Sequence, residues 1–325
     1  SVHLQRFTAA FNLGVFENDL KIKAWSLPER RAEVAAAMDV LSHRGVALKG
    51  HVLIWPGFRY LTPDFERFQK NPKLVSRMMK DHLESVLTAT YGKISRWDVV
   101  NEAYTNTDLQ RITGSEDILY QGFRMLKKRE PGVLRYVNEY GIISRGGIDT
   151  QKQQWYYDFV RRIDAATGGL VDGVGIQSHI GSDLTPPEKV LQILDFYAPL
   201  GKKISISEFT MDIDDPEVRT RYTRDFITAA FSHPSVYEFL FWGYKTEKAD
   251  IYDAQWRHGT MGKAFFDLVH GEWKTKLLLA TDDKGMVSGR GFWGKYEYTV
   301  MLDGKLYKGE FDLLPGQGNV LKIKL

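Results

Sequence analysis

Short apolar segments alternate along most of the chain with longer amphipathic segments, and this alternation restricts the fold more than any other feature. The apolar segments are rich in Val, Ile, Leu and Phe, as expected for parallel strands buried on both faces. They cover residues 11–16, 47–54, 96–100, 134–138, 172–178, 203–207 and 239–242. Helical patterns occupy 29–44, 67–91, 115–130, 149–167, 187–199, 215–231 and 260–269. This order predicts a parallel α/β fold.

Two parallel architectures compete, the doubly wound open sheet and the (β/α)8 TIM barrel. No glycine-rich phosphate-binding motif follows the early strands, which disfavours nucleotide-binding open sheets. Most of the predicted strands are followed directly by a polar residue, an aromatic residue or a glycine. These residues are Glu17, Asn18, Trp55, Asn101, Glu102, Glu139, His179, Glu208 and Gly243. A barrel gathers the carboxyl ends of its strands around one mouth, so these side chains converge there. We therefore predict a TIM barrel, with seven strands visible and the first one missing from the N-terminal side.

The pattern changes near residue 273, which divides the chain into a predicted barrel at 1–272 and a β appendage at 273–325. Short strands are expected at 274–280, 286–291, 295–302, 305–313 and 319–325. Asp303-Gly304 between two of them is a strong hairpin signal. So small an antiparallel unit rarely folds alone, and we expect it to pack on the barrel. Its aromatic residues Trp293, Tyr296 and Tyr307 are candidates for an accessory carbohydrate surface, although a structural cap is the simpler interpretation.

Composition excludes several classes of protein. The net charge of +3 is too small to indicate a nucleic-acid or membrane partner. No apolar run reaches the roughly 18 residues that a membrane span requires. The absence of cysteine excludes disulfides, thiolate catalysis and cysteine-ligated metals. The aromatic content of 13% fits either large cores or sugar-binding surfaces.

Two strands of the predicted barrel end in glutamate. The strand within residues 97–103, WDVVNEA, ends in Asn101-Glu102, and residues 204–209, ISISEF, carry Glu208. A third strand ends in Gln177, Ser178 and His179. Glycoside hydrolysis requires one protonated carboxyl group and one carboxylate on either side of an anomeric carbon. Two glutamates facing each other across a barrel mouth would meet this requirement, with His179 orienting the carboxylate.

Seven ordered segments resemble glycoside hydrolase family 10, whose typical members are endo-β-1,4-xylanases. They are FENDLK (16–21), GHVLIW (50–55), WDVVNEA (97–103), VNEY (137–140), GVGIQSHIG (173–181), ISEF (206–209) and FWG (241–243). The resemblance covers about residues 11–270 and implies a (β/α)8 barrel with a retaining mechanism. It identifies Glu102 as the acid/base and Glu208 as the nucleophile, with carboxyl groups about 5–5.5 Å apart.

The resemblance also implies roles for other residues. Asn101 would hold the sugar 2-hydroxyl at the cleavage point, and Gln177 and His179 would be partners of the nucleophile. The remaining expected substrate contacts are Glu17, Asn18 and Lys21 on the non-reducing side, Trp242 as a stacking wall, Trp55, and Tyr140 on the reducing side. His51 is interpreted as structural.

Two departures from the family pattern affect the sugar-binding rim. Pro56 stands where the family usually has a sugar-contacting His, and residues 244–252 offer Tyr244 and Tyr252 instead of a second Trp. The expected activity is therefore endo-cleavage of xylan, with another or decorated β-glycan as an alternative and a non-catalytic carbohydrate-binding barrel as a third. His179, Glu208 and Asp212 could form a metal site, but catalysis explains His179 and Glu208 better, so no cofactor is expected. A structural Ca²⁺ bound by loop carboxylates is compatible with the sequence. We expect a secreted or periplasmic monomer whose partner is the polysaccharide.

Overall fold

The computed structural model describes residues 1–316 and 319–323, and the chain divides into two compact units, residues 1–264 and 265–325. The first unit contains an eight-stranded parallel sheet that is nearly closed into a barrel. Its strands are β1 (Leu13–Val15), β2 (Ala47–Ile54), β3 (Arg96–Asn101), β4 (Leu134–Glu139), β5 (Gly173–Ile176), β6 (His179–Ile180), β7 (Lys203–Met211) and β8 (Val236–Phe241). The prediction of a TIM-type barrel is confirmed.

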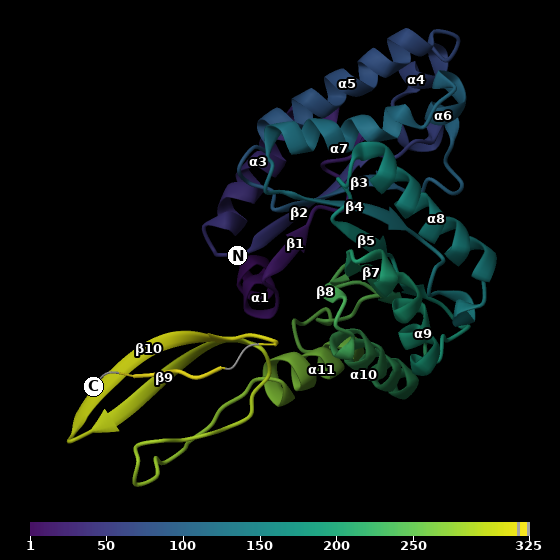
Figure 1. Ribbon diagram of the computed structural model, residues 1–325. Coiled ribbons are helices and arrows are strands. Elements are labelled where there is room, and N and C mark those ends of the chain that lie inside the picture. Colours follow the sequence, from purple (N-terminus) through teal and green to yellow (C-terminus); the bar gives the residue numbers. More distant parts are fainter. Residues whose placement is uncertain (317–318, 324–325) are drawn as a thin grey trace. The chain divides into compact units, whose positions relative to one another are not determined.

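Helices cover the outside of this sheet (Figure 1). They are α1 (Val2–Ala10), α2 (Ile22–Trp25), α3 (Pro28–Ser42), α4 (Pro63–Arg67), α5 (Pro72–Ala89), α6 (Asp108–Thr113), α7 (Asp117–Arg129), α8 (Thr150–Thr167), α9 (Pro187–Tyr197), α10 (Pro216–Ser232) and α11 (Thr260–Phe265). Short 3-10 turns occur at η1 (Phe58–Tyr60), η2 (Arg145–Gly147) and η3 (Ala198–Leu200), and a π-helical turn, η4, at Phe266–Glu272. Proline at the first helical position begins α3, α5 and α10, where a missing N–H costs nothing. Helix α1 was not predicted from the sequence.

The sheet is open at one place. Strand β1 pairs with β2 and β8 pairs with β7, and no pairing joins β1 to β8 among the described residues. This is where the sequence indicated a missing strand. Phe7 of α1 and Phe11, which directly follows the helix, lie at the opening: the ring of Phe7 is 5.4 Å from that of Tyr244, and the ring of Phe11 is 6.4 Å from that of Phe241. A cavity of about 200 Å³ remains beside them.

The interior of the barrel carries a buried charge cluster as well as apolar side chains. Lys49 on β2 is 1% exposed, and its ammonium lies 3.1 Å from Asp98 and 2.9 Å from Glu238. Asp98 also lies 2.9 Å from Nδ1 of His51. Buried charges persist only when they are paired, so this cluster ties β2, β3 and β8 together. It agrees with the structural interpretation of His51.

The second unit contains one antiparallel hairpin, β9 (Gly294–Leu302) and β10 (Lys305–Leu313), which turns at Asp303-Gly304 as predicted. The expected strands at 274–280 and 286–291 are wrong, because these residues form no ladder in the structure. Their side chains are largely exposed, with Leu278 fully so, and a strand without a partner or a buried face is not stable. No strand forms over 319–323, and the last two residues of that prediction lie outside the described part. Packing of 273–325 on the barrel stays a prediction.

No helix in the described part of the chain is both long enough and apolar enough to cross a membrane.

Candidate active site

Both predicted catalytic glutamates lie at the carboxyl ends of central barrel strands. Glu208 lies near the end of β7 and is 5% exposed, whereas Glu102 directly follows β3 and is half-buried. The backbone of Glu102 has a φ of 53°, in the left-handed region that side chains with a Cβ rarely adopt. Its N–H donates to the carbonyl of Asn138 at 2.9 Å, which holds this turn against β4.

Hydrogen bonds fix both carboxylate oxygens of Glu208. Nε2 of His179 lies 3.0 Å from Oε2, and Nδ1 of the same ring lies 2.9 Å from Oγ1 of Thr210. Nδ2 of Asn138 donates to Oε1 at 2.8 Å. The carboxylate of Glu208 is thus held in one orientation. The contact with His179 matches the expectation from the sequence, whereas Asn138 was given no role.

Gln177 contacts the other glutamate. Its Nε2 donates to Oε1 of Glu102 at 2.9 Å, so its expected position beside the nucleophile is corrected. Gln177 directly follows β5, the strand on which it was expected. Burial raises the pKa of Glu102 above its usual range, the hydrogen bond from Gln177 opposes this, and the charge of Glu208 raises the pKa further. A raised pKa suits a group that must donate a proton.

Asn101 connects the two halves of the site. Its Oδ1 accepts hydrogen bonds from Asn138 at 3.0 Å and from Gln177 at 3.4 Å. Oγ of Ser207 in turn donates to Oδ1 of Asn138 at 2.6 Å. Buried polar groups are rarely left without a partner, yet Nδ2 of Asn101 makes no hydrogen bond with any described residue. It is a free donor beside the carboxyl pair.

Lys21 lies on one side of the carboxyl pair. Its ammonium donates to Oδ1 of Asn18 at 2.9 Å and lies 5.1 Å and 5.8 Å from the ring centroids of Trp55 and Trp242. Burial lowers the pKa of Lys21, while the charges of Glu208, Glu17 and Glu102 oppose the change. These predicted residues are therefore brought together around the glutamates.

Tyr60 was missed by the sequence reasoning. Its ring stacks on Trp55 with centroids 3.5 Å apart and planes 10° apart. Burial raises the pKa of Tyr60, the charge of Glu102 raises it further, and Arg59 opposes the change. The only sequence signal for Tyr60 was its place five residues after Trp55, the last residue of the GHVLIW motif.

Tyr140 and Glu139 lie at the end of β4. The backbone N–H of Tyr140 donates to Oε1 of Glu139 at 3.2 Å, and the tyrosine hydroxyl lies 3.4 Å from Oγ1 of Thr105 in the loop after Glu102. Tyr140 is therefore on the Glu102 side of the site, as its expected contact with the reducing-side sugar requires.

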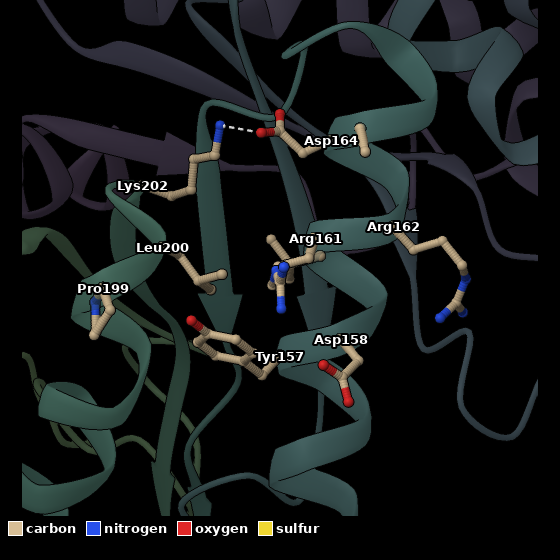
Figure 2. Close-up of a pocket in the computed structure, with 10 residues that line it drawn as sticks. Tyr157, Asp158, Arg161, Arg162, Asp164, Pro199, Leu200 and Lys202 are labelled. Atoms are coloured by element: carbon tan, nitrogen blue, oxygen red, sulfur yellow. Dashed lines mark ion pairs between the residues drawn. The ribbon is translucent and has the colours of Figure 1, made fainter.

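A larger hollow, of about 580 Å³, lies away from the strand ends, on the outer surface between α8 and η3. Figure 2 shows the side chains that line it, among them Tyr157, Arg161 and Pro199. Its charges are mostly paired: Lys202 lies 2.7 Å from Asp164 and Arg162 binds Glu116. It contains no pair of neighbouring free carboxyl groups, so the strand-end site remains the candidate for catalysis.

No group of three or more His, Asp or Glu side chains within 1–316 and 319–323 has the arrangement of a metal site. Each of the three residues considered as ligands has another partner: His179 and Glu208 bind each other, and Asp212 pairs with Lys248 at 2.8 Å.

A parallel barrel with paired carboxyl groups at its strand ends, one desolvated and one held by hydrogen bonds, is an arrangement that glycoside hydrolases use. Residues 2–268 match the sequence profile of glycosyl hydrolase family 10. The chain therefore belongs to this family, which confirms the resemblance drawn from the seven motifs.

Several curated proteins are similar in sequence. Endo-1,4-beta-xylanase 3 of Arabidopsis thaliana is 27% identical over 302 residues, which are 90% of this chain and 39% of the relative. Anti-sigma-I factor RsgI6 of Acetivibrio thermocellus is 28% identical over 325 residues, covering 95% and 40%. Endo-1,4-beta-xylanase B of Paenibacillus barcinonensis is 26% identical, covering 74% and 75%. The chain thus spans about two fifths of the length of the first two relatives.

Solved structures agree on the fold. Native xylanase 10B from Thermotoga maritima superposes with a TM-score of 0.73 at 18% identity, covering 83% of this chain and 89% of that one. Xylanase 10B from Thermotoga petrophila, in complex with xylobiose, gives a TM-score of 0.72 at 18% identity, covering 83% and 88%. At this identity the likeness establishes the barrel architecture alone.

Proposed function

We propose that the protein is a retaining, endo-acting glycoside hydrolase that cleaves internal β-1,4-xylosidic bonds of xylan. The observation that carries the proposal is the hydrogen-bonded chain Glu102–Gln177–Asn101–Asn138–Glu208. It places a carboxyl group with a raised pKa and an oriented carboxylate within one small group of side chains.

In the first step of the proposed double displacement, a carboxylate oxygen of Glu208 attacks the anomeric carbon and forms a glycosyl ester. Glu102 gives its proton to the departing glycosidic oxygen, so the bond to the leaving sugar breaks without releasing an alkoxide. In the second step Glu102 takes a proton from water, the water oxygen attacks the same carbon, and the ester bond to Glu208 breaks. Two inversions at one carbon retain its configuration.

The neighbouring residues would bind the sugar in the proposed complex. The free Nδ2 of Asn101 would donate to the 2-hydroxyl at the cleavage point, a contact that strengthens in the transition state. Glu17, Asn18 and Lys21 would bind the non-reducing-side sugar, and Trp55 and Trp242 flank Lys21 as apolar walls. Tyr140 would contact the reducing side.

Xylan is the favoured substrate because two of the relatives above are named endo-1,4-beta-xylanases. The altered rim, with Pro56 and residues 244–256, would tune the accepted chain or its decorations. Because a polymeric substrate does not cross a membrane, we infer that the enzyme acts outside the cytoplasm. We propose separately that it is a monomer. Size-exclusion chromatography with light scattering tests the second point.

A second candidate function is recognition of a polysaccharide without cleavage. It is favoured by one observation, the similarity over 95% of this chain to a protein named as an anti-sigma factor. The retained Glu102 and Glu208 favour catalysis over this alternative.

The test is release of reducing sugar from a panel of xylan, arabinoxylan, glucuronoxylan, mixed-linkage glucan and an algal galactan, with Glu208→Ala as the blank. Release from a xylan that is lost in the variant supports the proposal. Release only from another glycan would support the same mechanism with that glycan, and not xylan, as the substrate. Binding to a polymer without release from any supports the second candidate.

A further inference from the structure

Lys152 is a buried lysine beneath the candidate active site. It lies in the first turn of α8, and only 3% of the residue is exposed. Its ammonium is 2.9 Å from Oε1 of Glu139 and 3.2 Å from the ring centroid of Tyr140. It also lies 5.0 Å from the ring centroid of Tyr104. A buried ammonium group needs such partners, because desolvation otherwise makes its charge costly.

Glu139 fixes the backbone of the same two tyrosines. Its Oε2 accepts a hydrogen bond from the N–H of Tyr104 at 3.2 Å, and its Oε1 accepts one from the N–H of Tyr140 at 3.2 Å. Burial raises the pKa of Glu139 to about 7, while the charge and contact of Lys152 act in the opposite direction. One ion pair thus holds the loops that follow β3 and β4.

The two tyrosines form a partly exposed aromatic surface beside Glu102. Tyr104 is two positions after Glu102 and is 36% exposed, and Tyr140 is half-buried. Trp155 of α8 supports Tyr104 from the side, with ring centroids 4.8 Å apart in an edge-on arrangement. Because Lys152 covers one face of Tyr140 at close range, the opposite face is the one left for a ligand.

The proton transfer from Glu102 indicates which sugar the two tyrosine rings face. An acid/base group donates its proton to the oxygen of the leaving sugar, so aromatic rings beside Glu102 face that sugar rather than the sugar that becomes bonded to Glu208. Tyr140 is already assigned to the reducing side; we propose that Lys152 and Glu139 are positioning residues which hold its ring and that of Tyr104, and that Tyr104 joins Tyr140 in binding the first reducing-side sugar. This inference rests on the proposed function and adds Tyr104, Lys152 and Glu139 to it.

A comparison of two substrates distinguishes a loss of reducing-side binding from a general loss of activity. A nitrophenyl β-xylobioside fills the non-reducing side and has no sugar beyond the cleaved bond, whereas xylotetraose requires the reducing side. We expect Lys152→Met and Tyr104→Leu to lower kcat/KM for xylotetraose about tenfold relative to the nitrophenyl substrate. Lys152→Arg should restore much of the loss, because it keeps the cation beneath Tyr140. The exposed residues Lys128 and Tyr91 supply the controls Lys128→Met and Tyr91→Leu.

Lys152→Met leaves Glu139 buried and unpaired, so the double variant Glu139→Gln/Lys152→Met is measured as well. It removes both charges and keeps one amide oxygen, which can accept from only one of the two tyrosine N–H groups. An unchanged ratio between the two substrates in Tyr104→Leu and in the double variant would overturn the inference while the proposed function stands. If the parent protein hydrolyses neither substrate, the proposed function fails and the inference fails with it.

Discussion

The amide of Asn138 donates a hydrogen bond of 2.8 Å to Oε1 of Glu208. The same amide group donates to Oδ1 of Asn101, the residue before the proposed acid/base, so one side chain links the two strand ends that carry the carboxyl groups. The two carboxyl groups are joined by this hydrogen-bonded chain, yet their environments differ. Glu102 is desolvated with a raised pKa, and Glu208 is oriented by donors on both oxygens. Separation of two carboxyl groups by environment is the usual basis of acid and nucleophile roles.

The hydrogen bond from Gln177 to Glu102 predicts a pH effect. A donor to the ionised carboxylate lowers its pKa, so Gln177→Leu should raise the pKa of Glu102 further. Since Glu102 must be protonated at the start, the basic limb of the pH profile of kcat/KM should move to higher pH in this variant. Gln154→Leu, on the exposed surface of α8, is the matched control and should leave the limb in place. A basic limb that moves to lower pH would contradict the role of Glu102.

Loss of the proton donor should depend on the leaving group. Glu102→Ala should lower the rate on xylan by ~10²–10⁴-fold and largely spare the first step with dinitrophenyl xylobioside, whose leaving group needs little protonation. Steady-state and burst kinetics on the two substrates measure the difference. Equal losses on both substrates would contradict general acid catalysis by Glu102.

Loss of the nucleophile should be more severe. Glu208→Ala should lower turnover by at least ~10⁴-fold on every glycoside, because no ester intermediate forms. Azide should then enter the space left by the carboxylate and give a glycosyl azide of inverted configuration, which NMR identifies. Hydrolysis by Glu208→Ala at a rate near that of the parent would contradict the assignment of Glu208 as the nucleophile.

The buried ion cluster predicts a pH-dependent stability. Burial favours a raised pKa for Glu238, but Lys49 together with hydrogen bonds from Ser205 and Arg96 outweighs it and lowers the pKa to about 2. The folded-state pKa is therefore depressed, and its contribution to stability is present above about pH 4.5 and is lost as the pH falls through about 2. Glu238→Gln should cost about 3 kcal/mol at neutral pH and progressively less in acid.

Urea unfolding at several pH values measures this dependence. The control is Asp117→Asn, which breaks the exposed pair with Arg124 and should change the free energy of unfolding by less than ~1 kcal/mol. A Glu238→Gln loss that stays constant down to pH 2 would show that the carboxylate charge is not the stabilising feature.

The barrel and its carboxyl pair could be predicted from the sequence because both depend on local patterns. Buried strands show as apolar runs, and the residues after them must converge once the sheet curves into a barrel. The positions of Glu102, Glu208 and His179 followed from that reasoning. The contact of Gln177 with Glu102 did not, because the choice between two glutamates depends on side-chain direction across the sheet rather than on order along the chain.

Other features depend on contacts distant in sequence. Lys152 lies in a helix, and nothing in the sequence indicates that its ammonium reaches Glu139 and two tyrosine rings. The strands expected at 274–280 and 286–291 had apolar residues in a suitable pattern but no partner strand to pair with. Alternation indicates a strand only when another segment supplies the ladder.

The configuration of the first product tests the central claim most directly. Fresh enzyme is mixed with xylotetraose, and the anomeric protons of the released reducing ends are followed by NMR before mutarotation equilibrates them. A double displacement through Glu208 predicts that the β anomer appears first and the α anomer grows in later. An α anomer that appears first would mean single inversion by water and would contradict the roles given to both glutamates.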